Sequence, residues 1–350
     1  MNSLRLVLLP LSFVYWIVGV VRNWFFDIGV IGVSRLHVPV ISVGNISTGG
    51  SGKTPFVEFL VNRLKASGHK PAVVSRGYGR ETRGYVLVSD EKGLRAGARE
   101  GGDEPVLLAE KMPGTPVAVG EDRVEASRTI LRGTGADCIV LDDGFQHRFI
   151  HRDLDIVLLT APGMFSRRWL LPAGNWRETL GSLRRADMVA ISKCNDEAEY
   201  NRAIQVLRGK GTVRASGFRY ELAALRRVPS GAPVDERVIR KSRVVITAGI
   251  GDFGSFRNSV EQLGCKVEKS IEFRDHYWYT VPDLGRMREV FQNQKADFLI
   301  TTEKDYVRMR TLGAPCESFL GEVPMAVLGI RLRFIAGEET VGELMEGIFA

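Results

Sequence analysis

The segment VPVISVGNISTGGSGKT, residues 38–54, decides the fold. Its first part is apolar and rich in β-branched residues, which is typical of a short buried strand. Residues 44–54 form a glycine-rich turn, and residues 55–66 are predicted to be a helix. Strand, glycine-rich turn and helix in this order are what a phosphate cradle requires. The segment therefore predicts a nucleotide-binding α/β unit of the P-loop type.

The residues of this turn have the chemistry that phosphate binding needs. Backbone N–H groups freed by Gly49, Gly50 and Gly52 can face phosphate oxygens, and the helix N-terminus adds its dipole. Lys53 can reach the β and γ oxygens, and Thr54 can ligate Mg²⁺. The usual pattern begins with glycine five residues before the Gly–Lys pair, where this chain has Ser47. The predicted ATP-binding loop comprises Ser47, Thr48, Gly49, Gly50, Ser51, Gly52, Lys53 and Thr54.

An acidic pair follows another predicted strand. Further strands are expected at residues 71–75, 115–119, 138–141, 156–160 and 188–192, with helical stretches between most of them, which indicates a doubly wound α/β sheet. Asp142 and Asp143 stand at the end of the strand at 138–141, where such sheets place their ligands. Adjacent carboxylates are more than a turn requires. We therefore expect one of Asp142 and Asp143 to serve the metal.

Composition limits the protein class. The chain has 350 residues, of which 44% are hydrophobic, so it can bury a full core and is expected to form two domains. The net charge of +7 favours an anionic partner, which could be nucleotide, nucleic acid or a membrane surface. The four cysteines include no CxxC pair, so neither a disulfide framework nor a zinc site is indicated, and a reducing cytoplasm fits best.

The N-terminus carries an apolar run from Leu6 to Val21, bracketed by arginines. A bilayer-spanning helix needs roughly 20 apolar residues, so the run is short, and Pro10 interrupts it. Tyr15, Trp16 and Trp24 are aromatic residues of the type found at membrane interfaces. We therefore predict a monotopic membrane anchor. The alternatives are a buried core helix and a signal peptide, although no small-residue cleavage site follows the run.

Three further polar clusters surround the predicted sheet. They are SRGYGR at residues 75–80, GGDEP at 101–105 and LLPAGNWRE at 170–178. Arginine can neutralise phosphate by bidentate contact, so Arg76, Arg123 and Arg177 are candidates for substrate or γ-phosphate recognition. Each of these arginines, taken alone, is more often a solvated surface charge.

The second half predicts another α/β unit. Its elements are strands at 244–248 and 298–302 and a helix at 255–263, and a glycine-rich turn at 249–254 lacks the lysine of a P-loop. That turn is expected to be a tight strand-to-helix connection. Stretches at 216–228 and 325–334 could pair as a two-stranded linker. The cluster FRDHY at 273–277 contains His276, for which a structural and a catalytic role stay equally open.

Seven motifs occur in a fixed order over residues 44–305: GNISTGGSGKTP, SRGYGR, GGDEP, VLDDGFQHR, LLPAGNWRE, FRDHY and TTEKD. Together they resemble those of the tetraacyldisaccharide 4'-kinase family, over nearly the whole chain, and Ser47 matches that family's own loop. The resemblance implies two α/β domains joined by a two-stranded β-ribbon and preceded by a membrane-associated helix. The expected boundaries are 1–34 for the helix, 35–215 for the P-loop kinase domain, 216–228 and 325–334 for the ribbon, 229–324 for the second domain and 335–350 for a C-terminal helix.

The resemblance also implies a reaction and roles for residues. The family transfers the γ-phosphate of ATP to the 4'-hydroxyl of a tetraacyldisaccharide 1-phosphate, a lipid A precursor. It implies Lys53 and Thr54 at the phosphates and Mg²⁺, with Asp142 and Asp143 around the metal. It also implies Asp103 as the catalytic carboxylate, supported by His276. Motif positions that would bind substrate or phosphate are occupied by Arg76, Tyr78, Arg123, Gln146, His147, Arg177 and Glu178. The family's LREP-like motif is Trp-Arg-Glu-Thr here, at residues 176–179.

Two other classes of protein share parts of this pattern. One is a P-loop ATPase or GTPase switch at the membrane surface, and the other is a membrane-binding module with a vestigial loop, against which intact Lys53, Thr54 and Asp142 argue. The predicted cofactors are ATP and Mg²⁺. The expected partners are the lipid A precursor and the membrane surface, with no nucleic acid and no obligate protein partner. The expected location is the cytoplasmic face of the bacterial inner membrane.

Overall fold

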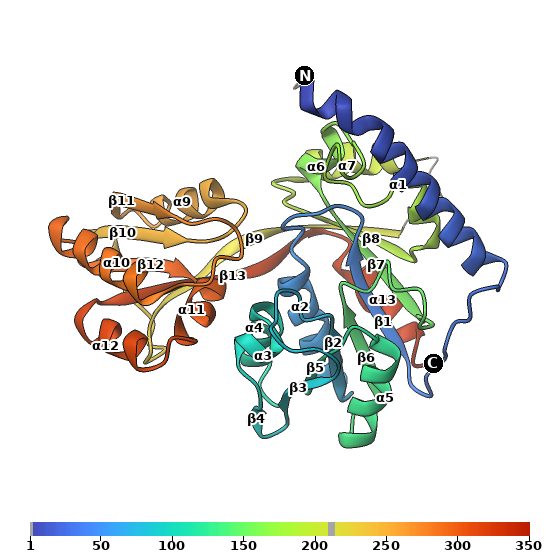
Figure 1. Cartoon of the computed structure of the whole chain (residues 1–350), viewed down its shortest axis with the longest axis horizontal. Coiled ribbons are helices and arrows are strands. Elements are labelled where there is room, and N and C mark those ends of the chain that lie inside the picture. The colour runs from blue at the N-terminus through green and yellow to red at the C-terminus, as the bar shows by residue number, and fades with distance from the viewer. Residues whose placement is uncertain (1–2, 209–213) are drawn as a thin grey trace.

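The structure is a computed structural model that describes residues 3–208 and 214–350. Two α/β lobes are joined by a pair of long strands, β9 (Arg214–Arg227) and β13 (Met325–Ala336) (Figure 1). These strands pair in antiparallel register from Ala326 opposite Arg227 to Ala336 opposite Gly217. Because β8 pairs with the start of β9 and β12 with the start of β13, one sheet runs through both lobes.

The N-terminal lobe contains the elements before β9 and the last helix. Its strands are β1 (Val40–Asn45), β2 (Pro71–Ser75), β3 (Val86–Asp90), β4 (Gly93–Leu94), β5 (Val117–Val119), β6 (Cys138–Asp142), β7 (Leu154–Thr160) and β8 (Met188–Ser192). Its helices are α1 (Ser3–Asp27), α2 (Lys53–Ala66), α3 (Ala98–Gly101), α4 (Asp103–Lys111), α5 (Arg123–Gly133), α6 (Ala161–Phe165), η1 (Leu180–Arg185), α7 (Glu197–Leu207) and α13 (Glu338–Gly347).

The second lobe lies between β9 and β13. It contains α8 (Glu236–Ile239), β10 (Arg243–Ala248), α9 (Phe253–Glu261), β11 (Lys266–Glu272), α10 (Val281–Asn293), β12 (Phe298–Thr302), α11 (Glu303–Arg310) and α12 (Ala314–Glu322). Helices cover both faces of its strands: α9 packs with Val244 and Ile246, whereas α10 and α12 pack with Val245 and Leu299.

The strand order places the glycine-rich turn at the centre of the N-terminal lobe. In the described residues the sheet has 13 strands in the order β11-β10-β12-β13-β9-β8-β7-β1-β6-β2-β5-β3-β4. Strand β1 lies between β7 and β6 and is parallel to both. This position is a topological switch point, where open α/β sheets bind their ligands. The predicted fold of a P-loop-like sheet, a smaller α/β unit and a connecting ribbon is confirmed.

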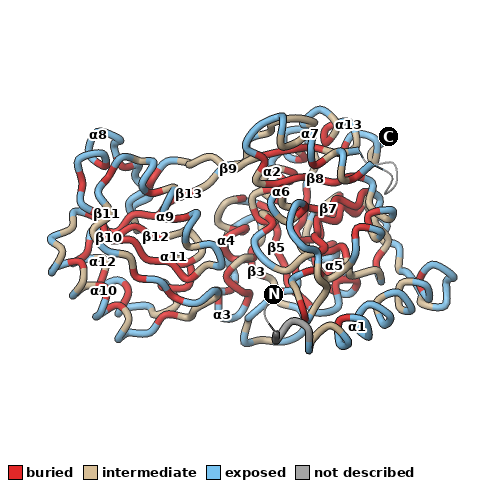
Figure 2. The backbone as a smooth tube through the Cα atoms, turned by 90° about the horizontal axis from the view of Figure 1, so that it is seen from above, coloured by how far each residue is buried: buried red, intermediate tan, exposed pale blue. Residues whose placement is uncertain are grey.

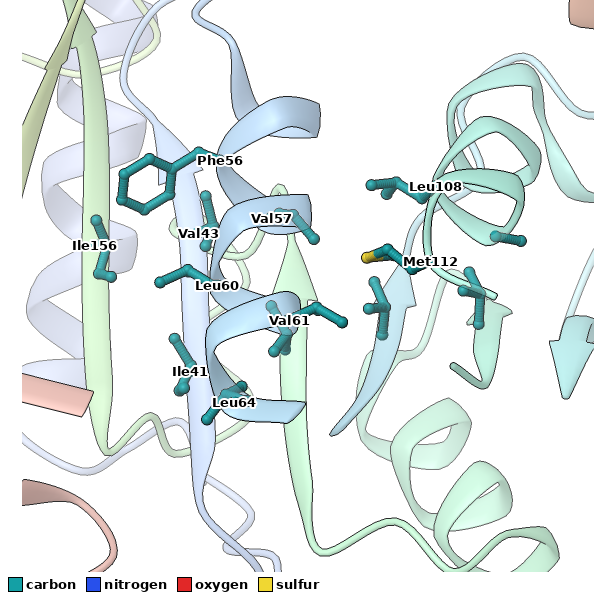
Figure 3. Close-up of a cluster of buried hydrophobic side chains, with 14 of the residues drawn as sticks. Ile41, Val43, Phe56, Val57, Leu60, Val61, Leu64, Leu108, Met112 and Ile156 are labelled. Atoms are coloured by element: carbon teal, nitrogen blue, oxygen red, sulfur yellow. The ribbon is translucent and has the colours of Figure 1, made fainter. Parts of the chain in front are cut away.

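Helix α2 is fixed by an apolar face that is packed on both sides. Phe56, Leu60 and Leu64 lie against Ile41 and Val43 of β1, and Val57 and Val61 of the same helix extend the contact toward α4 (Figure 3). Leu60 is fully buried, and a large-to-small substitution at such a site costs about 2–5 kcal/mol. The start of α2, which follows the turn, is therefore held rigidly above the sheet.

Helix α1 corrects two expectations about the N-terminus. It continues through Pro10, which lies in its first half, although proline removes one helical hydrogen bond. The apolar stretch Val7–Asp27 has 21 residues, long and apolar enough to cross a bilayer. Only 6% of the most apolar 18-residue stretch of α1 is buried, and α1 lies along the outside of the N-terminal lobe (Figure 2). The alternative of a buried core helix is therefore wrong.

Sequence patterns also missed several elements. The expected helix at 255–263 is α9, which begins two residues earlier at an Asp252 cap, and the expected strand at 115–119 is the three-residue β5. Strands β3 and β11 and helices α4, α10 and α11 were not predicted. Strand β11 alternates poorly between buried and exposed residues, so its sequence carries little strand signal.

Candidate active site

The glycine-rich turn adopts a conformation that requires glycine at its end. Gly52 has φ 83°, and a Cβ added there would lie 1.2 Å from the hydroxyl oxygen of Tyr220, on β9 of the ribbon. The Tyr220 hydroxyl donates to the Ser51 carbonyl oxygen at 3.3 Å. The Asn45 amide donates to Ser51 Oγ at 2.9 Å and ties the turn to its own strand. No side chain caps the start of α2, so its N–H groups are left for a ligand.

The acidic pair lies beside this turn with two different environments. The Asp143 carboxylate is 3.3 Å from Lys53 Nζ and 3.1 Å from Arg177 Nη1. Burial raises the pKa of Asp143, but these two cations outweigh burial and hold it below its ordinary value. Asp142 is buried, and its Oδ2 accepts from Ser75 Oγ at 3.0 Å. Burial, followed by the charge of Glu104, raises the pKa of Asp142 to about 6.

The residues near Arg177 form one connected group at the same end of the sheet. The Gln146 amide donates to the Asn45 carbonyl oxygen at 2.8 Å and to Glu178 at 3.0 Å. Glu178 is also paired with Arg185 at 2.5 Å. The predicted residues Gln146, Arg177 and Glu178 are thus brought together with Asp143 and Lys53.

Asp103 and His276 meet across the two lobes. Asp103 begins α4 in the N-terminal lobe, and His276 lies in the loop between β11 and α10. His276 Nδ1 is 3.4 Å from Asp103 Oδ2, and Arg308 Nε is 3.2 Å from the same oxygen. Burial raises the pKa of Asp103, but His276, Arg308 and Lys304 lower it by more than burial raises it. The carboxylate is therefore ionised near neutral pH. The carboxylate in turn raises the pKa of His276.

The helix pair α4 and α11 holds the lobes at this point. Lys304 pairs with Glu104, Arg310 pairs with Glu110, and Lys111 Nζ is 3.0 Å from Glu303. These residues of the N-terminal lobe belong to α4, and their partners Glu303, Lys304 and Arg310 belong to α11. Sequence reasoning used the TTEKD motif only for the resemblance and missed Glu104, Lys304 and Arg308 as site residues. Charged residues at helical spacing were the available signal, but which helix they face is not readable from spacing.

The remaining candidates lie at the edge of this group. Arg76 is exposed, and Tyr78 is 73% exposed with its ring edge-on to His276 at 5.7 Å between centroids. Arg123 is buried, and its Nη1 lies 3.3 Å from His147 Nδ1. Burial, followed by the charge of Arg123, lowers the pKa of His147 to about 4, so this imidazole is neutral at pH 7. The structure brings Arg123 and His147 together but does not pair either with Lys53.

The donor set near the turn fits a divalent cation of the Mg²⁺ type. The Asp142 Oδ1 atom is buried without a hydrogen-bond partner, and Thr54, at the first turn of α2, supplies a hydroxyl. Mg²⁺ in phosphate sites uses one or two carboxylates and keeps waters and phosphate oxygens as its other ligands. Among the described residues no group of three His, Cys, Asp or Glu side chains is placed to hold a metal ion. The site therefore suits a cation that arrives with a phosphate ligand.

Comparison with known proteins identifies close relatives. A sequence model described as tetraacyldisaccharide-1-P 4'-kinase matches residues 4–349. Curated tetraacyldisaccharide 4'-kinases include one from Chlorobaculum parvum, 38% identical over 97% of this chain and 93% of that protein. Another, from Bdellovibrio bacteriovorus, is 36% identical over 88% of this chain and 91% of that protein.

A solved structure is similar over the full length. It is the crystal structure of the "apo" form of LpxK from Aquifex aeolicus in complex with ATP. The TM-score is 0.81 at 32% sequence identity, with 99% of this chain and 100% of that chain covered. The two-lobe architecture is therefore shared with that protein.

Proposed function

The chain belongs to the tetraacyldisaccharide-1-P 4'-kinase family, and we propose the catalytic and binding roles of the residues at the junction of its lobes. The reaction is the ATP-dependent transfer of the γ-phosphate to the 4'-hydroxyl of a tetraacyldisaccharide 1-phosphate, a step of lipid A synthesis. Residues 35–215 form the ATP-binding domain and residues 229–324 the second domain, joined through 216–228 and 325–334. The observation that carries this proposal is the ion pair between His276 and Asp103. Asp103 lies on the same short helix, α4, as Glu104.

ATP binds to residues 47–54. The uncapped N-terminus of α2 and the N–H groups of the glycine-rich turn receive the phosphates, and Lys53 neutralises charge on the β and γ oxygens. Thr54 and Asp142 would hold Mg²⁺, with Asp143 beside them. When bound, Mg²⁺ neutralises charge that develops on the transferred phosphoryl group. Arg177 and Arg123, with Gln146, His147, Glu178, Arg76 and Tyr78 around them, bind and orient the anionic parts of the substrates.

Asp103 accepts the proton of the attacking hydroxyl. A sugar hydroxyl is a poor nucleophile, and a carboxylate within reach gains from being ionised and oriented. The lowered pKa of Asp103 and the ion pairs with His276 and Arg308 supply both conditions. His276 positions the carboxylate and tunes its basicity. Because Asp103 and His276 come from different lobes, the dyad forms only when the lobes are docked.

The reaction assay also tests the acceptor. The purified chain is incubated in mixed micelles with γ-labelled ATP, Mg²⁺ and a tetraacyldisaccharide 1-phosphate, and lipids are separated from inorganic phosphate. Label in the lipid is expected, and it should be absent when the 4'-hydroxyl of the acceptor is replaced by hydrogen. Label released only as inorganic phosphate would favour the ATPase switch.

We propose that helix α1 provides a membrane-facing surface and that the enzyme acts at the cytoplasmic face of the inner membrane. Val7, Val14 and Val18 are 71%, 56% and 61% exposed. At about 100° per residue they lie within about 40° of one another on the helix, so they form one apolar stripe. An acylated substrate does not leave the bilayer cheaply, and an interfacial helix brings the enzyme to its headgroup.

The apolar stripe is tested by a variant that keeps the helix docked. In the triple variant Val7→Ser, Val14→Ser and Val18→Ser, sedimentation with vesicles of phosphatidylethanolamine and phosphatidylglycerol should fall by at least about tenfold, because buried apolar area drives such binding. ATP affinity in detergent should stay within twofold. Unchanged sedimentation would refute the membrane anchor. Unchanged labelling of the substrate in micelles would agree with the anchor, because that assay contains no vesicles.

A further inference from the structure

Ser12 is an exception on α1. Its surroundings on the helix are exposed apolar residues, but Ser12 itself is 7% exposed. Its hydroxyl oxygen lies 3.0 Å from the Leu170 carbonyl oxygen and 3.3 Å from that of Leu8, either of which can accept its proton, and it accepts from the Ala173 N–H at 3.1 Å. Ser12 is about 140° around the helix from Val7, so it belongs to the face that contacts the N-terminal lobe. The Ser12 hydroxyl therefore contacts both ends of the segment at residues 170–173.

That segment is a compact loop stabilised by its own backbone. The Leu171 N–H donates to the Trp176 carbonyl oxygen at 2.9 Å, and the Gly174 N–H donates to the Leu170 carbonyl oxygen at 2.9 Å. Trp176 is 2% exposed and packs in a buried cluster with Phe145 and Leu180. A displacement of residues 170–173 is therefore transmitted to Asn175 and Trp176 at the other end of the loop.

The loop ends directly on the nucleotide-binding turn. The Thr48 N–H donates to the Asn175 carbonyl oxygen at 2.6 Å, and the Thr48 hydroxyl lies 3.1 Å from the same oxygen. Ser47 forms an antiparallel bridge with Trp176, and the Arg177 N–H donates to the Ile46 carbonyl oxygen at 2.7 Å. Hydrogen bonds, joined by the backbone of residues 170–176, therefore connect Ser12 of α1 with the first residues of the ATP-binding turn.

We infer that Ser12 is a positioning residue for the nucleotide site: by holding the 170–176 loop, it fixes the turn at Ser47 and Thr48 in its ATP-binding conformation. Helix α1 then has two separate faces. Its apolar stripe meets the membrane, and its Ser12 face couples the docked helix to the ATP site. The inference rests on the proposed ATP-binding role of residues 47–54, but not on the proposed membrane role of the stripe.

The test measures ATP affinity in detergent without lipid acceptor. Ser12→Ala removes the hydroxyl that faces the Leu170 and Leu8 carbonyl oxygens and leaves the Ala173 N–H without its partner, so the Kd for ATP should rise by about 3- to 10-fold. In the full reaction the KM for ATP should rise by a similar factor, whereas kcat should change by less than twofold. Ser12→Thr keeps the hydroxyl and should restore the affinity. The triple valine variant is the matched control on the opposite face and should bind ATP normally.

A second measurement reports on the path itself. Hydrogen exchange of peptides covering residues 46–49 and 173–177 should accelerate in Ser12→Ala, while a peptide covering α13 should not change. Unchanged ATP affinity in Ser12→Ala, an equal loss in Ser12→Thr, or faster exchange confined to residues 170–173 would each overturn the inference. If the wild-type protein did not bind ATP, the proposed function would be refuted instead. If Ser12→Ala lost vesicle binding but kept normal ATP affinity, Ser12 would serve only the anchor.

Discussion

Each lobe contains a buried strand, a glycine-rich turn and a helix, yet the two turns leave their helices in opposite states. In the N-terminal lobe, β1 leads through Gly49 to Gly52 into α2, whose first N–H groups have no side-chain cap. In the second lobe, β10 leads through Gly249 and Gly251 into α9, whose start is capped by Asp252. An open helix N-terminus attracts an anion, whereas a capped one already holds its own.

The second turn is used to hold other residues. The Gly249 carbonyl oxygen accepts from the His276 N–H at 3.2 Å and from Arg308 Nη1 at 3.0 Å, and the Gly249 N–H donates to Asp305. These bonds fix the His276 loop and α11 toward Asp103. In the proposed function the two turns therefore have complementary tasks: the first supplies the phosphate site, and the second positions His276 and α11 beside Asp103.

The largest effect is expected from removing the one cation that the second turn lacks. Lys53→Ala should abolish detectable transfer, with a loss in kcat/KM of at least about 10³, because the ammonium that neutralises β- and γ-phosphate charge is gone. Labelled-phosphate transfer to the micellar acceptor measures it. Lys53→Arg keeps the charge and separates it from geometry. Near-normal turnover in Lys53→Ala would remove the P-loop assignment.

The contribution of the second lobe is tested at the dyad. Asp103→Ala should lower kcat by about 10²- to 10⁴-fold, the usual range for loss of a general base, with ATP affinity nearly intact. His276→Ala should show a smaller loss of the same kind. Steady-state kinetics at saturating ATP provide the measurement.

Non-additivity decides whether the two residues act as one unit. The double variant should be little worse than Asp103→Ala, because residues that work together lose their effect together. Losses that add in log kcat, or unchanged kcat in His276→Ala, would show that the histidine is structural.

Gly52, directly before α2, and Gly254, at the start of α9, should respond differently to substitution by alanine. Gly52 has φ 83° and contacts Tyr220, whereas a Cβ at Gly254, within α9, meets no atom within 4 Å. Gly52→Ala should weaken ATP binding by about tenfold or more, because strain of this kind costs about 1–3 kcal/mol. Gly254→Ala should raise the free energy of unfolding by about 0.5–1 kcal/mol and leave ATP binding alone. Equal tolerance at both positions would contradict the proposed difference.

Much of the fold could be predicted because its signals are local. The strand, turn and helix around Lys53 are encoded in one continuous segment from Val40 to Ala66, and buried parallel strands such as β6 and β8 are largely apolar runs. Strands β3 and β11 could not be predicted in this way: β11 is an edge strand, β3 is covered on one side only by the two-residue β4, and both are partly exposed and weakly patterned. Pro10 misled the prediction for α1, because the helix continues through it although proline removes one helical hydrogen bond.

The site was predictable only in parts. Lys53, Thr54 and the Asp142–Asp143 pair follow from motif and strand position. Asp103 and His276 came from a family resemblance, because 173 residues separate them and no periodicity shows that two lobes dock there. Arg308 and Lys304 were missed for the same reason, since their partners lie on another helix. Long-range docking of charged faces is what the sequence pattern does not encode locally.

The smallest effect is expected at the cap of the second turn. Asp252 Oδ1 accepts from the Ser255 N–H at 3.1 Å, and Lys193 Nζ donates to Oδ2 at 2.8 Å. The Asp252 carboxylate is half exposed, so its ion pair contributes little, and the cap is the main term. Asp252→Ala should lower the free energy of unfolding by about 1 kcal/mol, measured by urea denaturation. Lys193→Ala is the control for the ion pair and should cost less than about 0.5 kcal/mol.

The pH dependence of this loss identifies its origin. The hydrogen bond from Lys193, together with that from Ser255, lowers the pKa of Asp252 to about 2, below its ordinary value of about 3.9. A lowered pKa means that the stabilisation is present above the ordinary value and is lost as the pH falls through about 2. The difference between wild type and Asp252→Ala should therefore be constant from pH 7 to about pH 4 and shrink below that. Uncapping α9 should not create ATP binding, because the turn still has no lysine. A pH-independent difference, or acquired ATP affinity in the second lobe, would show that the cap is not what distinguishes the two turns.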